Sequence, residues 1–193
     1  DLRTPLTRLR FRIENVPDDV RAKMAADIDQ MEEMISAALT FVRDTSRPGE
    51  RTPLELSSLL ESVCDEMAET GSDIEVERGE KVVLEGDPLS LRRLLDNLLE
   101  NAVKFGERAR ARVYREGDHA IVEIEDDGPG IPSEDFERVF EPFYRREPSR
   151  SRQTGGIGLG LAVVRSVARA HGGDAVLLNR EGGGLTARVQ LPI

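Results

Sequence analysis

Hydrophobic residues at the start of the chain recur at alternating intervals of four and three positions, in two successive series. This spacing predicts two helices, each with one narrow apolar stripe of the kind that packs against a nearly parallel neighbour. The polar break Pro17-Asp18-Asp19 between the series is short, which favours an antiparallel hairpin. The stripe positions are Leu2, Leu6, Leu9, Ile13, Val16, Met24, Ile28, Met31, Ile35, Ala38 and Val42.

The hairpin expected over residues 1–45 is too small to be stable alone, because a unit of about 40 residues buries little apolar surface. We therefore expect a second copy of the chain to complete a four-helix bundle, which makes the protein a homodimer. The first helix also lacks a normal start. Arg3, Arg8 and Arg10 occupy its first turns, where the helix dipole favours acidic residues, so we expect the helix to begin upstream of Asp1.

The rest of the chain has a different pattern. Residues 46–53 contain two prolines and a glycine and are predicted to be a linker. Over residues 54–193, helical periodicity and short β-like runs form separate groups, which indicates an α+β fold with helices packed on a mostly antiparallel sheet in a two-layer sandwich. Helices are expected at 54–67, 88–105 and 162–170, and strands at 74–77, 81–84, 111–114, 120–125, 175–179 and 185–193.

Composition excludes several classes of function. The net charge of −10 argues against a general nucleic-acid binder, because a polyanion would be repelled. Cys64 is the only cysteine, so the chain forms no internal disulfide, and a cysteine-based metal site is not expected. No segment approaches the roughly 18 apolar residues that a membrane-spanning helix needs.

Polar side chains form a stripe along the helix expected at residues 88–105. Asn97, Asn101 and Lys104 stand at positions i, i+4 and i+7, so they share one face of the helix. Amide oxygens are suitable ligands for Mg²⁺, and the ammonium group suits a phosphate. The alternative is the solvated face of an ordinary amphipathic helix.

An acidic residue and two glycines follow the strand Ile121-Val122-Glu123-Ile124-Glu125. Asp126, Gly128 and Gly130 have the spacing D-x-G-x-G. A carboxylate at a strand end can accept a hydrogen bond from an amino group such as that of adenine, and glycine lets the backbone approach a flat ligand. A simple turn is the alternative, since D-G and P-G are common turn dipeptides.

A third glycine-rich segment precedes the helix expected at residues 162–170. Gly156, Gly158 and Gly160 leave backbone N–H groups accessible at a helix start, which favours an anion. The pattern matches neither the Rossmann nor the P-loop motif. The preceding residues 141–156 are rich in arginine and suit a lid that meets phosphate charge.

Taken together, these segments resemble the N, G1, F and G2 boxes of the ATP-binding domain of sensor histidine kinases. The matching stretches are N-L-L-E-N-A-V-K, E-D-D-G-P-G-I-P, F-E-P-F-Y-R and G-G-I-G-L-G-L, and the resemblance covers residues 54–193. The first residues, D-L-R-T-P-L-T, resemble the sequence that follows the phosphoacceptor histidine of those kinases. On this resemblance the chain starts one residue after that histidine. His119 and His171 are not expected to replace it.

The resemblance implies a role for each site residue. Asn101 would coordinate Mg²⁺, Asp126 would recognise the adenine amino group, and Arg145 would approach the γ-phosphate. Asp1 would polarise the acceptor imidazole, and Thr4 would position water for dephosphorylation of a partner. The implied ATP-binding set is Asn97, Asn101, Lys104, Phe105, Asp126, Gly128, Gly130, Arg145, Thr154, Gly156, Gly158, Leu159, Gly160 and Leu161.

The resemblance further implies the cytoplasmic portion of a bacterial inner-membrane sensor, with the receiver domain of a response regulator as partner. Only segments absent from this chain would reach the membrane. The chain alone is not expected to autophosphorylate. Gyrase, mismatch-repair and chaperone relatives carry a water-activating glutamate where this chain has Asn97, so slow hydrolysis is expected. The alternatives are a nucleotide-gated ATPase of the same superfamily and a non-catalytic interaction module.

Overall fold

The computed structural model describes residues 3–14, 16–46, 49–145 and 157–193. The chain divides into two compact units, Asp1–Asp44 and Thr45–Ile193, which we call the hairpin unit and the sheet unit. Each unit is described by itself. No helix of the described residues is both long enough and apolar enough to cross a membrane.

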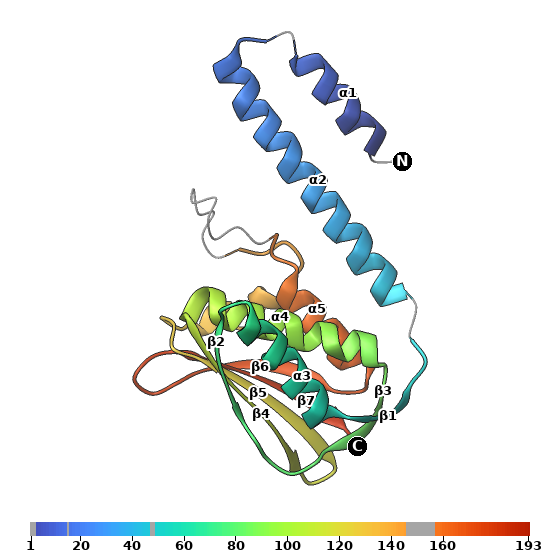
Figure 1. Ribbon diagram of the computed structural model, residues 1–193, viewed down its shortest axis with the longest axis vertical. Coiled ribbons are helices and arrows are strands. Elements are labelled where there is room, and N and C mark those ends of the chain that lie inside the picture. The colour runs from blue at the N-terminus through green and yellow to red at the C-terminus, as the bar shows by residue number, and fades with distance from the viewer. Residues whose placement is uncertain (1–2, 15, 47–48, 146–156) are drawn as a thin grey trace. The chain divides into compact units, whose positions relative to one another are not determined.

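The hairpin unit contains helices α1 (Arg3–Ile13) and α2 (Asp18–Ser46), which run antiparallel (Figure 1). Leu6, Ile13 and Ile28 form its buried centre, and Val16, Ala25 and Ile35 pack around them. The two helices thus bury part of the predicted stripes against each other. One copy supplies only this pair, so the four-helix bundle is not present in the chain and the homodimer stays a prediction.

Other members of the predicted stripes are not covered within one copy. Leu9, Met24 and Met31 are exposed, although they belong to the same periodic series as the buried residues. Arg10 forms ion pairs with Asp29 and Glu32 of α2, which tie the two helices together at the surface. Leu2 and the side chain of Val42 lie outside the described part of the unit.

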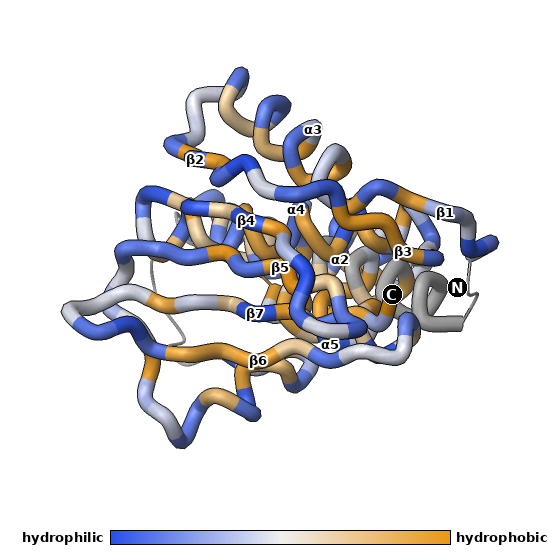
Figure 2. The backbone as a smooth tube through the Cα atoms, turned by 90° about the horizontal axis from the view of Figure 1, so that it is seen from below, coloured by the Kyte–Doolittle hydropathy of each residue, from blue (hydrophilic) through white to orange (hydrophobic). Residues whose placement is uncertain are grey.

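The sheet unit is built on a five-stranded sheet in the order β2-β4-β5-β7-β6, which Figure 2 shows from one side. Only β2 and β4 pair in parallel, and the other neighbours are antiparallel. Five of the predicted strands are confirmed in this sheet, several with longer bounds, and the one predicted at 81–84 is found at Val83–Gly86 in a separate sheet. The five are β2 (Asp73–Glu77), β4 (Arg108–Glu116), β5 (His119–Asp126), β6 (Asp174–Asn179) and β7 (Leu185–Pro192).

Helices α3 (Leu56–Glu69), α4 (Pro88–Gly106) and α5 (Gly160–Ala170) cover one face of this sheet (Figure 1). The apolar side of α4 is buried as its periodicity predicts, including Leu91, Leu95 and Leu98. Successive side chains of β4, β5 and β7 point to opposite faces of the sheet. On one face, small and branched residues of these strands pack against the helices. The expected α+β fold with helices on a sheet is confirmed.

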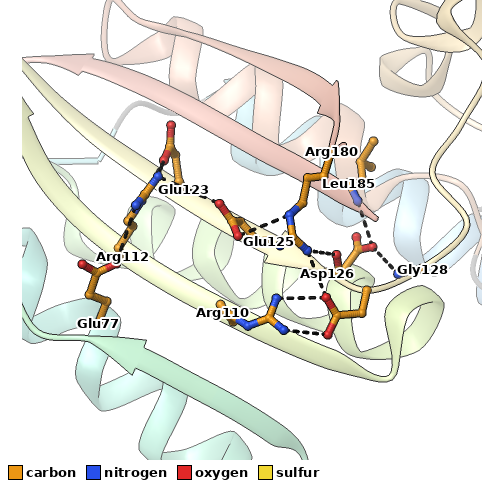
Figure 3. A network of polar contacts seen from close by, with 10 residues as sticks. Glu77, Arg110, Arg112, Glu123, Glu125, Asp126, Gly128, Arg180 and Leu185 are labelled. Atoms are coloured by element: carbon orange, nitrogen blue, oxygen red, sulfur yellow. Dashed lines mark hydrogen bonds and ion pairs between the residues drawn. The ribbon is translucent and has the colours of Figure 1, made fainter. Parts of the chain in front are cut away.

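The outer face of the sheet carries rows of opposite charge. Arg112 of β4 lies between Glu77 of β2 and Glu123 of β5, at 3.6 Å and 2.5 Å (Figure 3). On the other side Glu123 meets Arg188 of β7 at 3.4 Å. Opposite charges on adjacent strands stabilise the register, because each side chain faces its partner across the ladder. This face needs no helix to cover it.

The end of the predicted linker is a strand. Thr52–Glu55 forms β1, which pairs antiparallel with β3 (Val83–Gly86) in a separate two-stranded sheet. Pro53 lacks an N–H and signals a break in the sequence, but a two-stranded sheet has an open side that tolerates proline. Two short 3₁₀ turns, η1 (Ser133–Asp135) and η2 (Arg138–Phe140), follow β5.

Candidate functional site

Asp126 ends β5 and is only 8% exposed. The backbone N–H groups of Gly128 and Leu185 donate to its Oδ1, at 2.9 Å and 3.2 Å (Figure 3). No described residue donates to Oδ2. Burial raises the pKa of this carboxyl, and the two hydrogen bonds from the backbone amides oppose that rise. One oxygen is therefore held by the fold, while the other remains available to a ligand.

The glycines after Asp126 are required by close neighbours within the protein. A Cβ at Gly128 would lie 2.6 Å from the carbonyl oxygen of Phe105, at the end of α4. A Cβ at Gly130 would lie 2.6 Å from Oδ1 of Asn179, which also accepts from the Ile131 N–H at 3.0 Å. The sequence argument assigned this closeness to a ligand. The structure shows that the loop after β5 packs tightly against α4 and β6.

Asn97 and Asn101 face the start of α5. A Cβ at Gly160 would lie 3.0 Å from Oδ1 of Asn97 and 3.3 Å from Nδ2 of Asn101. Asn97 donates its Nδ2 to the carbonyl of Arg93 at 2.8 Å, which directs its oxygen toward Gly160. Asn101 makes no side-chain hydrogen bond to any residue that the structure describes. The polar stripe of α4 and the glycine-rich segment are thus brought together.

Lys104, in the last turn of α4, is influenced by the positive charge of Arg145. Burial lowers the pKa of Lys104, and the nearby Arg145 guanidinium lowers it further. The Lys104 ammonium also lies 5.3 Å from the centre of the exposed Phe105 ring. Two cations held close together favour an anion between them, because the anion relieves both repulsion and desolvation. A phosphate group has the required charge.

Gly158 joins the two ends of the segment that separates η2 from α5. Its carbonyl accepts from the Phe143 N–H at 2.9 Å, and its φ of +78° is one that glycine adopts readily. A Cβ there would lie 2.7 Å from the carbonyl oxygen of Tyr144. Leu159 is buried as the residue that precedes α5, and Leu161 is half-buried in the first turn.

The structure gathers most of the predicted ATP-binding set around the end of α4, the loop after β5 and the start of α5. Asp1, Thr154 and Gly156 lie outside the described residues. Thr4 is exposed in the first turn of α1, in the hairpin unit. His171 is buried, with Nδ1 2.8 Å from the Val167 carbonyl and Nε2 accepting from the Asp87 N–H at 3.1 Å.

Sequence reasoning missed several residues that shape this site. The Leu185 N–H, the Asn179 amide and Arg180, which donates to the Asp126 carbonyl at 2.9 Å, all come from β6, β7 and their turn. They lie some 50 positions from the loop that they hold. No sequence pattern near Asp126 predicts partners so distant along the chain.

Comparison with known proteins identifies the family. Residues 86–193 match the family described as histidine kinase-, DNA gyrase B-, and HSP90-like ATPase. The whole chain is 38% identical to the sensor histidine kinase GtrS of Pseudomonas aeruginosa, of which it spans 40%. It is 37% identical to the sensor protein RstB of Escherichia coli, over 100% of this chain and 47% of RstB.

Among solved structures, the mycobacterial sensor histidine kinase MprB is 31% identical with a TM-score of 0.64. The match covers 74% of this chain and 97% of that one. Sequence, fold and the order of the motifs therefore agree: the chain belongs to the histidine kinase-, DNA gyrase B- and HSP90-like ATPase family, and its sheet unit is a catalytic domain of the sensor histidine kinase type.

Proposed function

We propose that the chain is the cytoplasmic catalytic region of a membrane sensor histidine kinase. In this proposal it binds Mg-ATP and transfers the γ-phosphoryl group to a histidine, from which a response-regulator aspartate receives it. The observation that carries the proposal is the packing of Gly160 against the Asn97 and Asn101 amides, which brings a helix start suited to a phosphate next to a row of polar side chains. Asp126 supplies the base-recognition end of the same site.

Adenine recognition follows from the unused oxygen of Asp126. Oδ2 would accept a hydrogen bond from the adenine amino group, while Oδ1 stays bonded to the Gly128 and Leu185 amides. The ring of Phe105 is exposed and offers an apolar surface at the end of α4. Recognition of the base by a carboxylate that the backbone already holds costs little additional ordering on binding.

Phosphate binding follows from the cation pair and the glycine-rich helix start. Lys104 and Arg145 would face the phosphates, with the N–H groups at the start of α5 completing the cradle. Asn101 fits a Mg²⁺ ligand, because its amide is not committed to any described residue. The metal would neutralise phosphate charge. No cluster of His, Cys, Asp or Glu among the described residues is suited to hold a metal alone, so the nucleotide oxygens would supply the other ligands.

The transfer step needs positioning more than covalent help from the protein. The bond from the γ-phosphorus to the β–γ bridging oxygen breaks, a phosphorus–nitrogen bond forms on the acceptor imidazole, and ADP leaves. Stabilisation of charge on the equatorial oxygens would come from Lys104 and Arg145. Asn97 cannot act as a general base for water, so transfer to histidine would be favoured over hydrolysis.

The 193-residue chain should bind ATP without acquiring acid-labile phosphate. Neither described histidine suits the acceptor role, because both ring nitrogens of His171 are bonded and His119 starts β5 at the end opposite Asp126. Incubation with γ-labelled ATP tests this, since phosphohistidine is acid-labile. Acid-labile label on the chain would refute the assignment of the acceptor. Steady ATP turnover that is lost in Asn97→Ala would favour the ATPase alternative.

Asn101→Ala should remove the contribution of Mg²⁺ to ATP binding. We expect at least a tenfold loss, about the scale at which metal sites lose affinity when a supporting residue is removed. Calorimetry with ATP and excess MgCl₂ measures the loss. The same titration in EDTA is the control, and there the variant should match the wild type. Equal Mg²⁺ dependence in both proteins would place the metal ligand elsewhere.

The proposed homodimer rests on the uncovered half of the apolar stripes. Leu9, Met24 and Met31 are exposed in one copy at positions of the same series as buried Leu6 and Ile28. A second hairpin unit would cover them and complete four helices. Helix α1 would then present Thr4 near the proposed phosphorylation site for the receiver domain.

A further inference from the structure

Tyr144 and Asp135 form a partly buried polar contact just before Arg145. The Tyr144 hydroxyl donates to Oδ1 of Asp135 at 2.7 Å. Asp135 lies in η1 and is only 7% exposed, which is unusual for a carboxylate unless it is paired. The Arg138 guanidinium lies 4.6 Å from the centre of the Tyr144 ring and 3.7 Å from the Asp135 carboxylate. The Tyr144 ring is therefore held at its hydroxyl by Asp135 and over its face by Arg138.

The backbone around this contact is constrained. Phe143 has a φ of +66°, a left-handed conformation that a bulky residue adopts only when its surroundings enforce it. On one side its N–H donates to the Gly158 carbonyl at 2.9 Å, and on the other the Tyr144 N–H donates to the Glu141 carbonyl at 3.2 Å. The direction in which the chain leaves Tyr144 is thus set by several independent bonds.

The platform beneath the contact is also tied down. Arg165 of α5 bonds Glu137 at 2.6 Å and Asp174 of β6 at 2.9 Å, and its guanidinium lies 4.7 Å from the Phe140 ring. The turns η1 and η2 are therefore fixed to the same helix whose start faces Asn97 and Asn101. Tyr144 is held relative to the polar stripe of α4.

We propose that Tyr144 and Asp135 are positioning residues, whose hydrogen bond directs Arg145 toward the terminal phosphate and so favours a triphosphate over a diphosphate. The proposal rests on the nucleotide site proposed above. Arg145 follows Tyr144 directly in the chain, and its positive charge contributes to lowering the pKa of Lys104, which belongs to the proposed phosphate site. Tyr144 lies in the stretch F-E-P-F-Y-R, but neither it nor Asp135 belongs to the predicted set of site residues.

Tyr144→Phe tests the proposal, because phenylalanine keeps the ring beside Arg138 and loses only the hydroxyl. Calorimetry should show ATP affinity about 3- to 10-fold lower than in the wild type, the range expected for one hydrogen bond, with ADP affinity changed less than twofold. Asp135→Asn keeps an oxygen that can accept the bond from Tyr144 and should retain most of the preference for ATP over ADP. In an Arg145→Ala background, Tyr144→Phe should cause no further loss of ATP affinity, since the guanidinium that Tyr144 positions is absent.

Tyr114→Phe is the matched control. Tyr114 is the other of the two tyrosines in the chain, and its hydroxyl donates to buried Glu123 at 3.0 Å on the outer face of the sheet. This variant should leave the ratio of ATP to ADP affinity at the wild-type value. An unchanged ratio in Tyr144→Phe, or an equal loss in the Arg145→Ala background, would overturn the positioning role while the nucleotide site stands. A wild-type chain that binds neither nucleotide would overturn both.

Discussion

Asp126→Asn should lower the affinity for ATP by about 1–3 kcal/mol, or roughly 5- to 150-fold, because the adenine amino group would meet an amide donor where it needs an acceptor. Asparagine keeps the oxygen that accepts from the Gly128 and Leu185 amides. The loop and β7 therefore stay in place, and the loss is confined to the ligand. Calorimetry with ATP measures the change.

The same variant should unfold at the same temperature as the wild type or higher. Burial raises the pKa of Asp126 in the folded state above its unfolded value, so at neutral pH the ionised carboxylate destabilises the fold. Asparagine removes that penalty. As the pH falls through the raised value toward the unfolded value of about 3.9, the wild type loses the penalty and the difference between the proteins narrows.

Asp127→Asn is the control at the neighbouring position. Asp127 bonds Arg110 at 2.8 Å and Arg180 at 2.9 Å, and these hydrogen bonds lower its pKa. Its contribution to stability is present above the unfolded value and is lost as the pH falls through the lowered one. The control should therefore lose stability at neutral pH and keep its ATP affinity. If both variants bind ATP like the wild type, Asp126 is only a turn residue.

Elements with strong local patterns were predictable from the sequence. The leucines of α4 recur with the helical period, and the structure buries that face while leaving Asn97 and Asn101 on the other. The helical period of the apolar residues also predicted both helices of the hairpin unit. The prediction of an ATP-binding site depended on the order of the motifs along the chain, because each motif alone has a common structural alternative.

Partners distant along the chain were not predictable. One of the two N–H groups that bond Asp126 belongs to Leu185, and any residue except proline supplies an N–H, so the sequence at 185 contains no signal. Tyr144 belongs to a recognised motif, but nothing in the sequence indicates that its hydroxyl bonds Asp135, which is not part of any motif. The prediction of a linker up to Pro53 was wrong at its end. Proline is a local signal for a break, but Pro53 lies in a strand that pairs with β3.

Gly158→Ala should have the largest combined effect on folding and binding. A left-handed backbone costs an L-residue about 1–2 kcal/mol, and the added Cβ would also lie 2.7 Å from the Tyr144 carbonyl oxygen. Because that neighbour is backbone, the two ends of the segment must separate, and the bond from the Phe143 N–H is strained or lost. We expect ATP affinity to fall by about tenfold or more, as hydrogen bonds to the charged phosphates are lost.

Gly117→Ala isolates the contribution of the clash. Gly117 also has a positive φ, +60°, but a Cβ there meets nothing within 4 Å, and it lies in the turn between β4 and β5, at the end of β5 remote from Asp126. Both variants carry the left-handed backbone cost, and only Gly158→Ala disturbs the joined segment ends. Thermal unfolding and ATP titration should therefore show a modest loss of stability with wild-type binding for Gly117→Ala, and a larger loss of both for Gly158→Ala. Equal effects of the two substitutions on ATP binding would mean that the junction at Gly158 has no part in holding the phosphates.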